Sequence, residues 1–171
     1  MNHYCQLAKN TIDVFITAKK IIKPNNDLPE IFFVQRAGVF VSIYNKKELR
    51  GCVGTYLPTK DNLAKEIISS AISACKDSRF YPIETKELPF LSFEVYILEE
   101  PKIIKDLNDL DPKKYGILVI ANNKSGLLLP GLEGIKTIEE QIEIACDKAG
   151  INSDKEDISI FKFLAKKYVS D

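Results

Sequence analysis

The sequence has very little histidine and no dense group of metal-binding side chains. His3 is the single histidine, and the four cysteines, Cys5, Cys52, Cys75 and Cys146, are far apart. Zinc and iron–sulfur sites need clustered ligands, so we expect no metal site, and the sequence indicates no cofactor. Scattered cysteines are instead typical of free thiols in a cytoplasmic protein.

Net charge and long apolar runs are also missing. Lysine plus arginine and aspartate plus glutamate each total 24, so the formal net charge is zero. No overall basic field would therefore attract a nucleic acid. No apolar run approaches the roughly 20 residues of a membrane-spanning helix, and residues 1–6 do not resemble a secretion signal. We expect a cytoplasmic protein that binds neither membranes nor nucleic acids.

Arginine is rare enough for its positions to be informative. Only Arg36, Arg50 and Arg79 are arginines among the 24 basic residues. An arginine offers a planar, bidentate donor to carboxylates and phosphates, so Arg50 and Arg79 are candidates for binding an anion. The alternative is that they form ordinary ion pairs within the protein.

Residues 49–56 are chemically unusual, because Arg50, Gly51, Cys52 and Gly54 stand close together in a sequence typical of a strand. Glycines inside a strand indicate a bulge, or a place where a ligand or another backbone comes close. Residues two apart in a strand share a face, so we expect Arg50 beside Cys52. A cation there would favour the reactive thiolate. The alternative is that Cys52 is a small buried apolar side chain.

Hydrophobic periodicity predicts both helices and strands, with an antiparallel hairpin among the strands. Helices are expected near residues 4–21, 59–76 and 137–149. Strands are expected at 31–34, 38–44, 49–57, 91–97, 115–121, 127–129 and 157–166, with a short strand inside 101–114 and a helical alternative for 163–169. We expect residues 1–171 to form a single domain or two intimately packed lobes.

The order of these elements suggests an internal duplication. A hairpin, an irregular loop and an amphipathic helix occur at residues 38–76 and again at 115–150, which suggests two diverged copies of one unit. Only the first copy contains the arginine–glycine–cysteine stretch. We therefore expect the functional site in the first copy.

Several other positions bear on the site. Asp77 and Arg79 lie in a polar, aromatic turn after the second helix, without an obvious role in packing. Glu94 lies in the middle of a predicted strand, where a carboxylate is unfavourable, so we expect it to face water or to pair with an arginine. His3 lies near a terminus that is expected to fray, which leaves Glu94, Asp77 and Tyr56 as candidates for a general base.

Six separated segments of the chain carry a family resemblance. They are RAGVFV at 36–41, LRGCVG at 49–54, DSRF at 77–80 with Pro82, LSFEV at 91–95, GLLLP at 126–130 and KAG at 148–150. Together they resemble the AMMECR family, the A component of the so-called AmmeMemoRadiSam group, in which Arg-Gly-Cys-aliphatic-Gly is a hallmark. The motif positions of the family fall here on Arg50, Gly51, Cys52, Gly54, Asp77, Arg79 and Phe80. Many relatives have proline at the position of Ser78 and glutamine at that of Gly131.

The resemblance implies an α+β fold with antiparallel sheets and packed helices. Through the gene neighbourhood of prokaryotic members it also implies partnership with a Memo-like protein and a radical-SAM enzyme. It leaves the biochemical role open. One hypothesis is an uncharacterised enzyme or accessory subunit with a cysteine-centred site. Cys52 would be the nucleophile, Arg50 or Arg79 would activate it or bind an anionic substrate, and backbone amides beside Gly51 and Gly54 would bind an oxyanion. The alternative is a non-catalytic binding or scaffold module that recognises an anionic ligand or a partner protein.

Overall fold

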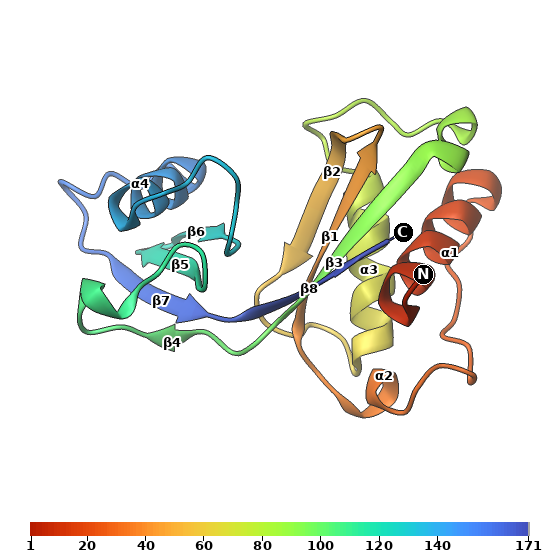
Figure 1. Ribbon diagram of the computed structural model, residues 1–171, viewed down its shortest axis with the longest axis horizontal. Helices are drawn as coiled ribbons and strands as arrows, with labels where there is room; N and C mark the ends of the chain where they lie inside the picture. Colours follow the sequence, from red (N-terminus) through yellow and green to blue (C-terminus); the bar gives the residue numbers. More distant parts are fainter. Residues whose placement is uncertain (171) are drawn as a thin grey trace. The chain divides into compact units, whose positions relative to one another are not determined.

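The structure is a computed structural model that describes residues 1–170, and it divides into two compact units (Figure 1). The first unit contains Met1–Leu98 and the C-terminal strand, and the second contains Glu99–Ala165. Each unit combines helices with one antiparallel sheet, and each has its own apolar core. The predicted α+β class with antiparallel sheets is confirmed.

The first unit is a four-stranded sheet with helices packed on one face. Its elements are α1 (His3–Ala18), α2 (Ile31–Val34), β1 (Gly38–Asn45), β2 (Glu48–Thr55), α3 (Leu63–Cys75), the 3-10 helix η1 (Thr85–Phe90), β3 (Leu91–Leu98) and β8 (Ala165–Val169). The strand order is β2-β1-β3-β8, so β2 is an edge strand. Val41, Val95 and Ile67 are fully buried between this sheet and the helices. Because side chains alternate along a strand, the residues next to Val41 and Val95 lie on the opposite face.

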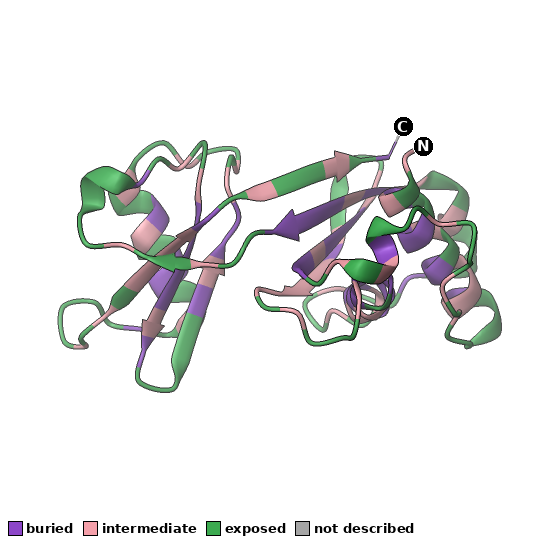
Figure 2. Cartoon of the chain, turned by 90° about the horizontal axis from the view of Figure 1, so that it is seen from below, coloured by how far each residue is buried: buried purple, intermediate pink, exposed green. Residues whose placement is uncertain are grey.

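The second unit repeats this plan on a smaller scale. Its elements are β4 (Lys102–Ile103), η2 (Leu107–Asp109), β5 (Gly116–Ala121), β6 (Lys124–Leu128), α4 (Ile138–Ala149) and β7 (Ser159–Phe163). The strand order is β4-β7-β5-β6, and α4 packs on β5 and β6. Thr137 and Glu140 form a capping box at the start of α4, as the sequence pattern of this segment indicates. Figure 2 shows that the central strands are largely buried, whereas most loops are exposed.

The two units share one order of elements, in agreement with the internal similarity seen in the sequence. A hairpin is followed by a helix and by a third strand that pairs with the first strand of the hairpin, giving β2-β1-β3 in one unit and β6-β5-β7 in the other. A common origin of the two units by duplication stays a prediction.

The hairpin of β1 and β2 has a strained turn and a bulge. Lys46 and Lys47 have φ of +49° and +74°, a left-handed conformation that costs free energy for residues other than glycine. Tyr44 pairs with Leu49 and Ile43 pairs with Gly51. Arg50 is therefore the extra residue of a β-bulge, a device that redirects side chains.

Two predicted strands differ from the structure. Residues 31–34, predicted as a strand, form the one-turn helix α2, which follows Pro29 and Glu30. A four-residue apolar run does not distinguish a strand from a buried helical turn. The single strand predicted at 157–166 is in fact two strands, β7 and β8, which lie in different sheets. The helical alternative for residues 163–169 is therefore wrong.

The prediction of a frayed N-terminus is also wrong. His3 begins α1, the Asn2 side chain caps this helix by accepting from the Cys5 N–H, and the His3 ring meets Phe32 edge-on at 6.5 Å. At its other end α1 finishes at Ala18, earlier than predicted, because the next residue adopts the left-handed conformation.

Candidate functional site

The backbone of Cys52 on the edge strand β2 is held by Asp77 and Arg79. The Cys52 N–H donates to Asp77 Oδ2 at 3.0 Å, and Arg79 Nη2 donates to the Cys52 carbonyl oxygen at 2.9 Å. Arg79 also donates to both carboxylate oxygens of Asp77, at 2.9 and 2.6 Å. We call these two residues the edge clamp, because they satisfy backbone groups that a neighbouring strand would otherwise bind.

The edge clamp is an ionised pair. Hydrogen bonds from the Arg79 side chain, aided by the N–H groups of Cys52 and Arg79, lower the pKa of Asp77 to about 2, against an opposing effect of burial. A carboxyl group with so low a pKa is a poor proton acceptor near neutral pH. Asp77, one of the candidate bases, is thus better suited to positioning Cys52.

The Cys52 side chain lies on the sheet face opposite α1 and α3, in a row of polar residues. Cys52 pairs with Ser42 across β2 and β1, and Ser42 pairs with Glu94 across β1 and β3. The Ser42 hydroxyl donates to Cys52 Sγ at 3.2 Å. Cys52 is half-buried, so it is neither the fully buried apolar side chain of the alternative hypothesis nor a freely exposed thiol.

Glu94 is the centre of the hydrogen-bond network in this row. It accepts from the hydroxyls of Tyr44 at 3.2 Å and Tyr96 at 2.9 Å, and it forms an ion pair with Lys167 at 2.6 Å. Glu94 pairs with a lysine of β8 and not with an arginine, and its side chain stays 16% exposed. We call the whole group the thiol cluster. It consists of Ser42, Tyr44, Cys52, Glu94, Tyr96 and Lys167.

The two tyrosines of the thiol cluster are held in their protonated form. Burial, followed by the negative charge of Glu94, raises the pKa of Tyr44 to about 12 and shifts the pKa of Tyr96 upward as well. The nearby Ser42 hydroxyl partly offsets the shift of Tyr44. The thiol, the Ser42 hydroxyl and the Glu94 carboxylate thus lie in one row across three strands.

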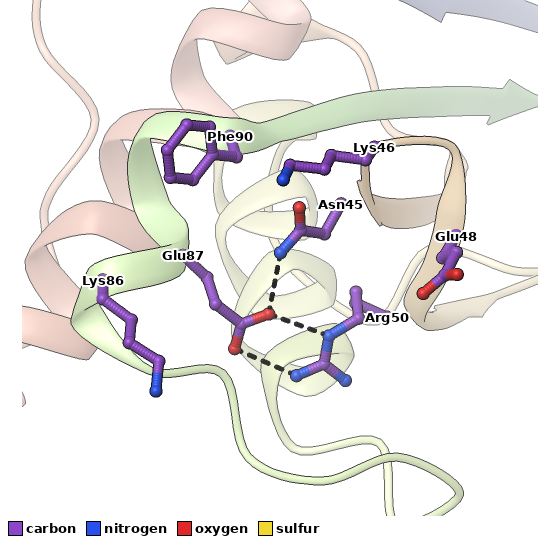
Figure 3. A pocket seen from close by; sticks show the side chains of 7 residues that line it. All are labelled: Asn45, Lys46, Glu48, Arg50, Lys86, Glu87 and Phe90. Carbon is purple, nitrogen blue, oxygen red and sulfur yellow. Dashed lines mark hydrogen bonds and ion pairs between the residues drawn. The ribbon is translucent and has the colours of Figure 1, made fainter.

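Arg50 points to a different partner from the one expected. Its Nη1 donates to the Tyr81 carbonyl oxygen at 3.3 Å. Its Nε and Nη2 donate to the two oxygens of Glu87, each at 3.0 Å (Figure 3). These bonds lower the pKa of Glu87 to about 2. Because Arg50 is the bulged residue, the regular alternation that would place it beside Cys52 is broken. The cation bound to Cys52 is Arg79.

A pocket of about 540 Å³ opens beside Arg50. Figure 3 shows its lining side chains, Asn45, Lys46, Glu48, Arg50, Lys86, Glu87 and Phe90. Glu87 already occupies the bidentate face of the guanidinium, and Asn45 Nδ2 also donates to Glu87 at 3.0 Å. An anionic ligand would have to displace this carboxylate to use the Arg50 fork.

The glycines of the motif allow close contact with protein backbone. A Cβ at Gly51 would overlap the carbonyl oxygen of Ala74 in α3, and a Cβ at Gly54 would overlap the carbonyl oxygen of Val39. The glycines were expected to mark either a bulge or a close backbone approach, and the structure has both features. The approaching groups are a helix and the neighbouring strand.

Sequence analysis missed one important residue, Glu66. It is 1% exposed and accepts four hydrogen bonds of 2.7 to 2.9 Å, from the hydroxyls of Thr55 and Thr59 and from the N–H groups of Thr59 and Lys60. A glutamate within the apolar stripe of α3, next to Ile67, is the signal that could have revealed it. Glu66 fixes the loop that leaves the motif-bearing strand.

Within residues 1–170, no three His, Cys, Asp or Glu side chains are placed so that they could hold a metal ion. Among the helices of this part of the chain, none has the length and the apolar character needed to cross a membrane. No disulfide joins the four cysteines in the part of the chain that the structure describes.

Comparison with known proteins agrees with the architecture and the motifs. Residues 5–168 match the AMMECR1 family model, and the chain belongs to the AMMECR1 family. A protein of Thermotoga maritima is 44% identical over 167 residues, which cover 96% of each chain. A protein of Clostridium acetobutylicum is also 44% identical over 96% of this chain, which spans only 35% of that longer protein.

A solved structure shows the same fold. The crystal structure of the uncharacterized protein PH0010 from Pyrococcus horikoshii superimposes with a TM-score of 0.90 and 29% sequence identity. The match covers 98% of this chain and 90% of the other. The resemblance inferred from the sequence motifs is confirmed.

Proposed function

We propose that this AMMECR1 domain supplies a cysteine-centred reactive site, in which Cys52 attacks or accepts an electrophilic group. The observation that carries the proposal is the thiol cluster, in which Cys52 Sγ accepts a hydrogen bond from Ser42 at 3.2 Å in a row that continues to Glu94. Polar side chains on a sheet face cost free energy unless they are paired. Linked titratable groups of this kind are enriched at functional sites.

Each member of the site has a distinct role in this proposal. The Ser42 hydroxyl stabilises a thiolate on Cys52 by donating to sulfur, and the edge clamp fixes the backbone of Cys52 while Arg79 contributes positive charge. Glu94 is the proton acceptor of this proposal, and it lies in the same row of the sheet as Cys52 and Ser42. The N–H of Cys52 donates to Asp77, so this backbone group is not open to an oxyanion.

The family resemblance extends the proposal to partners and location. We propose that the domain acts as an enzyme or accessory subunit in the cytoplasm, together with a Memo-like protein and a radical-SAM enzyme. A small protein whose thiol needs a substrate delivered or consumed by a partner would give little activity in isolation. Reactivity of the thiol itself is therefore the property to test first.

The test is the rate of Cys52 alkylation as a function of pH in a variant that carries Cys5→Ala, Cys75→Ala and Cys146→Ala. We expect the folded protein to react with iodoacetamide at neutral pH, and to react faster than the same variant after unfolding. Ser42→Ala should slow the reaction of the folded protein. Ser69→Ala, on α3, is the matched control and should leave it unchanged.

The opposite result would favour the alternative function. If Cys52 reacts only after unfolding, it is a structural residue and the nucleophile hypothesis fails. The remaining hypothesis would then be a binding or scaffold module that recognises an anionic ligand or a partner protein. In that case Arg79→Lys should weaken binding, because lysine does not reproduce the planar fork, whereas Cys52→Ser should leave binding intact.

A further inference from the structure

A second pocket lies on the other side of the first unit, between the segment that follows α1 and the outer surface of α3. Residues 20–24 leave the left-handed end of α1 at Lys19 and run past α3. The space between this segment and α3 has a volume of about 380 Å³, within the range of roughly 300–1,000 Å³ that is usual for small-molecule sites.

The floor and wall of this pocket are aliphatic. Ile22, Ile68 and Ile72 line it together with Pro24. Ile21 completes the wall and is 69% exposed. An isoleucine so exposed at the mouth of an apolar pocket gains free energy when an apolar group covers it.

The rim of the pocket is basic. Lys23, Lys60 and Lys65 line it, and no aspartate or glutamate is among its lining residues. The nearby carboxylate of Asp61 forms an ion pair with Lys65 at 2.6 Å, and its side chain is 82% exposed. The positive charges of the rim are therefore only partly neutralised.

At one rim lysine, Lys60, both the backbone N–H and the carbonyl oxygen form hydrogen bonds to side chains. The Lys60 N–H donates to the buried carboxylate of Glu66 at 2.7 Å, and Arg36 Nε donates to the Lys60 carbonyl oxygen at 3.3 Å. Arg36 thereby brings a further cation to this edge of the pocket. The rim is thus built on a fixed loop, and its charge complements an anion.

We propose that this pocket binds an amphiphilic anion, a small molecule with an aliphatic body and a carboxylate or phosphate head. The aliphatic body would cover Ile21 and contact Ile68 and Ile72, and the head would lie among Lys23, Lys60 and Lys65. The site is independent of Cys52 and of the reaction proposed above. Nothing in the thiol cluster contributes to it.

The experiment is an NMR titration of the uniformly ¹⁵N-labelled full chain with decanoate and with decyl phosphate, below their micellar concentrations. We expect saturable shifts of the amides of Ile68, Ser69, Ile72 and Ser73. Decanol and decylamine share the aliphatic chain but lack the negative charge, and we expect each to bind at least about tenfold more weakly than the better anion, a difference of about 1.4 kcal/mol. The stronger of the two anions identifies the head group.

Variants test the basic rim and the aliphatic wall of the pocket separately. Lys23→Glu with Lys60→Glu should weaken anion binding about tenfold, because two exposed charges are reversed. The matched control is Lys105→Glu with Lys155→Glu, which makes the same change in net charge elsewhere. Ile21→Glu should also weaken binding, whereas Val34→Glu, at a site 65% exposed, should not.

Several outcomes would overturn the proposal. These are the absence of saturable shifts with either anion, equal affinity for decanol or decylamine, and shifts that map away from α3. Binding of an acidic amphipathic peptide at this pocket, in the absence of anion binding, would likewise reject it and assign a peptide-docking surface instead. Circular dichroism of each variant checks that the fold is intact.

Discussion

Replacing Asp77 by asparagine should remove the charge of the edge clamp while keeping its shape. An amide oxygen at this position still accepts from the Cys52 N–H, so the change isolates the ionic part of the interaction with Arg79. The pKa of Asp77 falls from an ordinary value of 3.8 to about 2 in the folded protein. At 1.36 kcal/mol per pKa unit, that difference corresponds to about 2 kcal/mol.

Screening by water reduces this stabilisation. The Arg79 side chain is 57% exposed, although that of Asp77 is only 5% exposed. We therefore expect Asp77→Asn to lower the free energy of unfolding at pH 7 by about 1–2 kcal/mol. The pKa is depressed on folding, so the stabilisation is complete above pH 3.8 and is lost as the pH falls toward 2. At pH 3 about half of it should remain.

The assay is urea unfolding of the two proteins at several pH values from 7 to 3, followed by circular dichroism. Asp154→Asn, at an exposed position, is the matched control and should show little difference from the natural chain. The reasoning would be refuted if Asp77→Asn were as stable as the natural chain at pH 7, or if the difference grew as the pH fell.

Two further predictions concern the same hairpin. Gly51→Ala should lower the free energy of unfolding by about 1–3 kcal/mol, because its Cβ must displace the carbonyl of Ala74; an unchanged urea midpoint would contradict this. Lys47→Gly should raise the free energy of unfolding by about 1 kcal/mol, because it relieves a φ of +74°. A lower thermal midpoint for Lys47→Gly would show that the turn is not strained.

Much of the fold was predictable, because long periodic segments carry a strong local signal. The helix over residues 63–75 and the hairpin of 38–55 follow from apolar spacing and from a polar turn. The strand predicted at residues 31–34 was wrong because four apolar residues fit either a strand or a helical turn. The split of the last strand into β7 and β8 depends on which sheet each half joins, and local sequence does not contain that information.

The site was predicted less completely, because its contacts join distant parts of the chain. The glycines correctly indicated a bulge and a close backbone approach around Cys52. The bulge itself then broke the rule that placed Arg50 beside Cys52. The partners of Arg50 and Glu94, which are Glu87 and Lys167, lie 37 and 73 residues away along the chain.

The position of β8 has a consequence for how the protein folds as it is synthesised. In the first sheet β8 lies next to β3, yet all of the second unit, residues 99–165, is made between them. These 67 residues (165 − 99 + 1) take roughly 3 to 13 s to translate at 5–20 residues per second. Throughout that interval the outer hydrogen-bonding edge of β3 has no partner, which gives chaperones and other nascent chains a window for binding it.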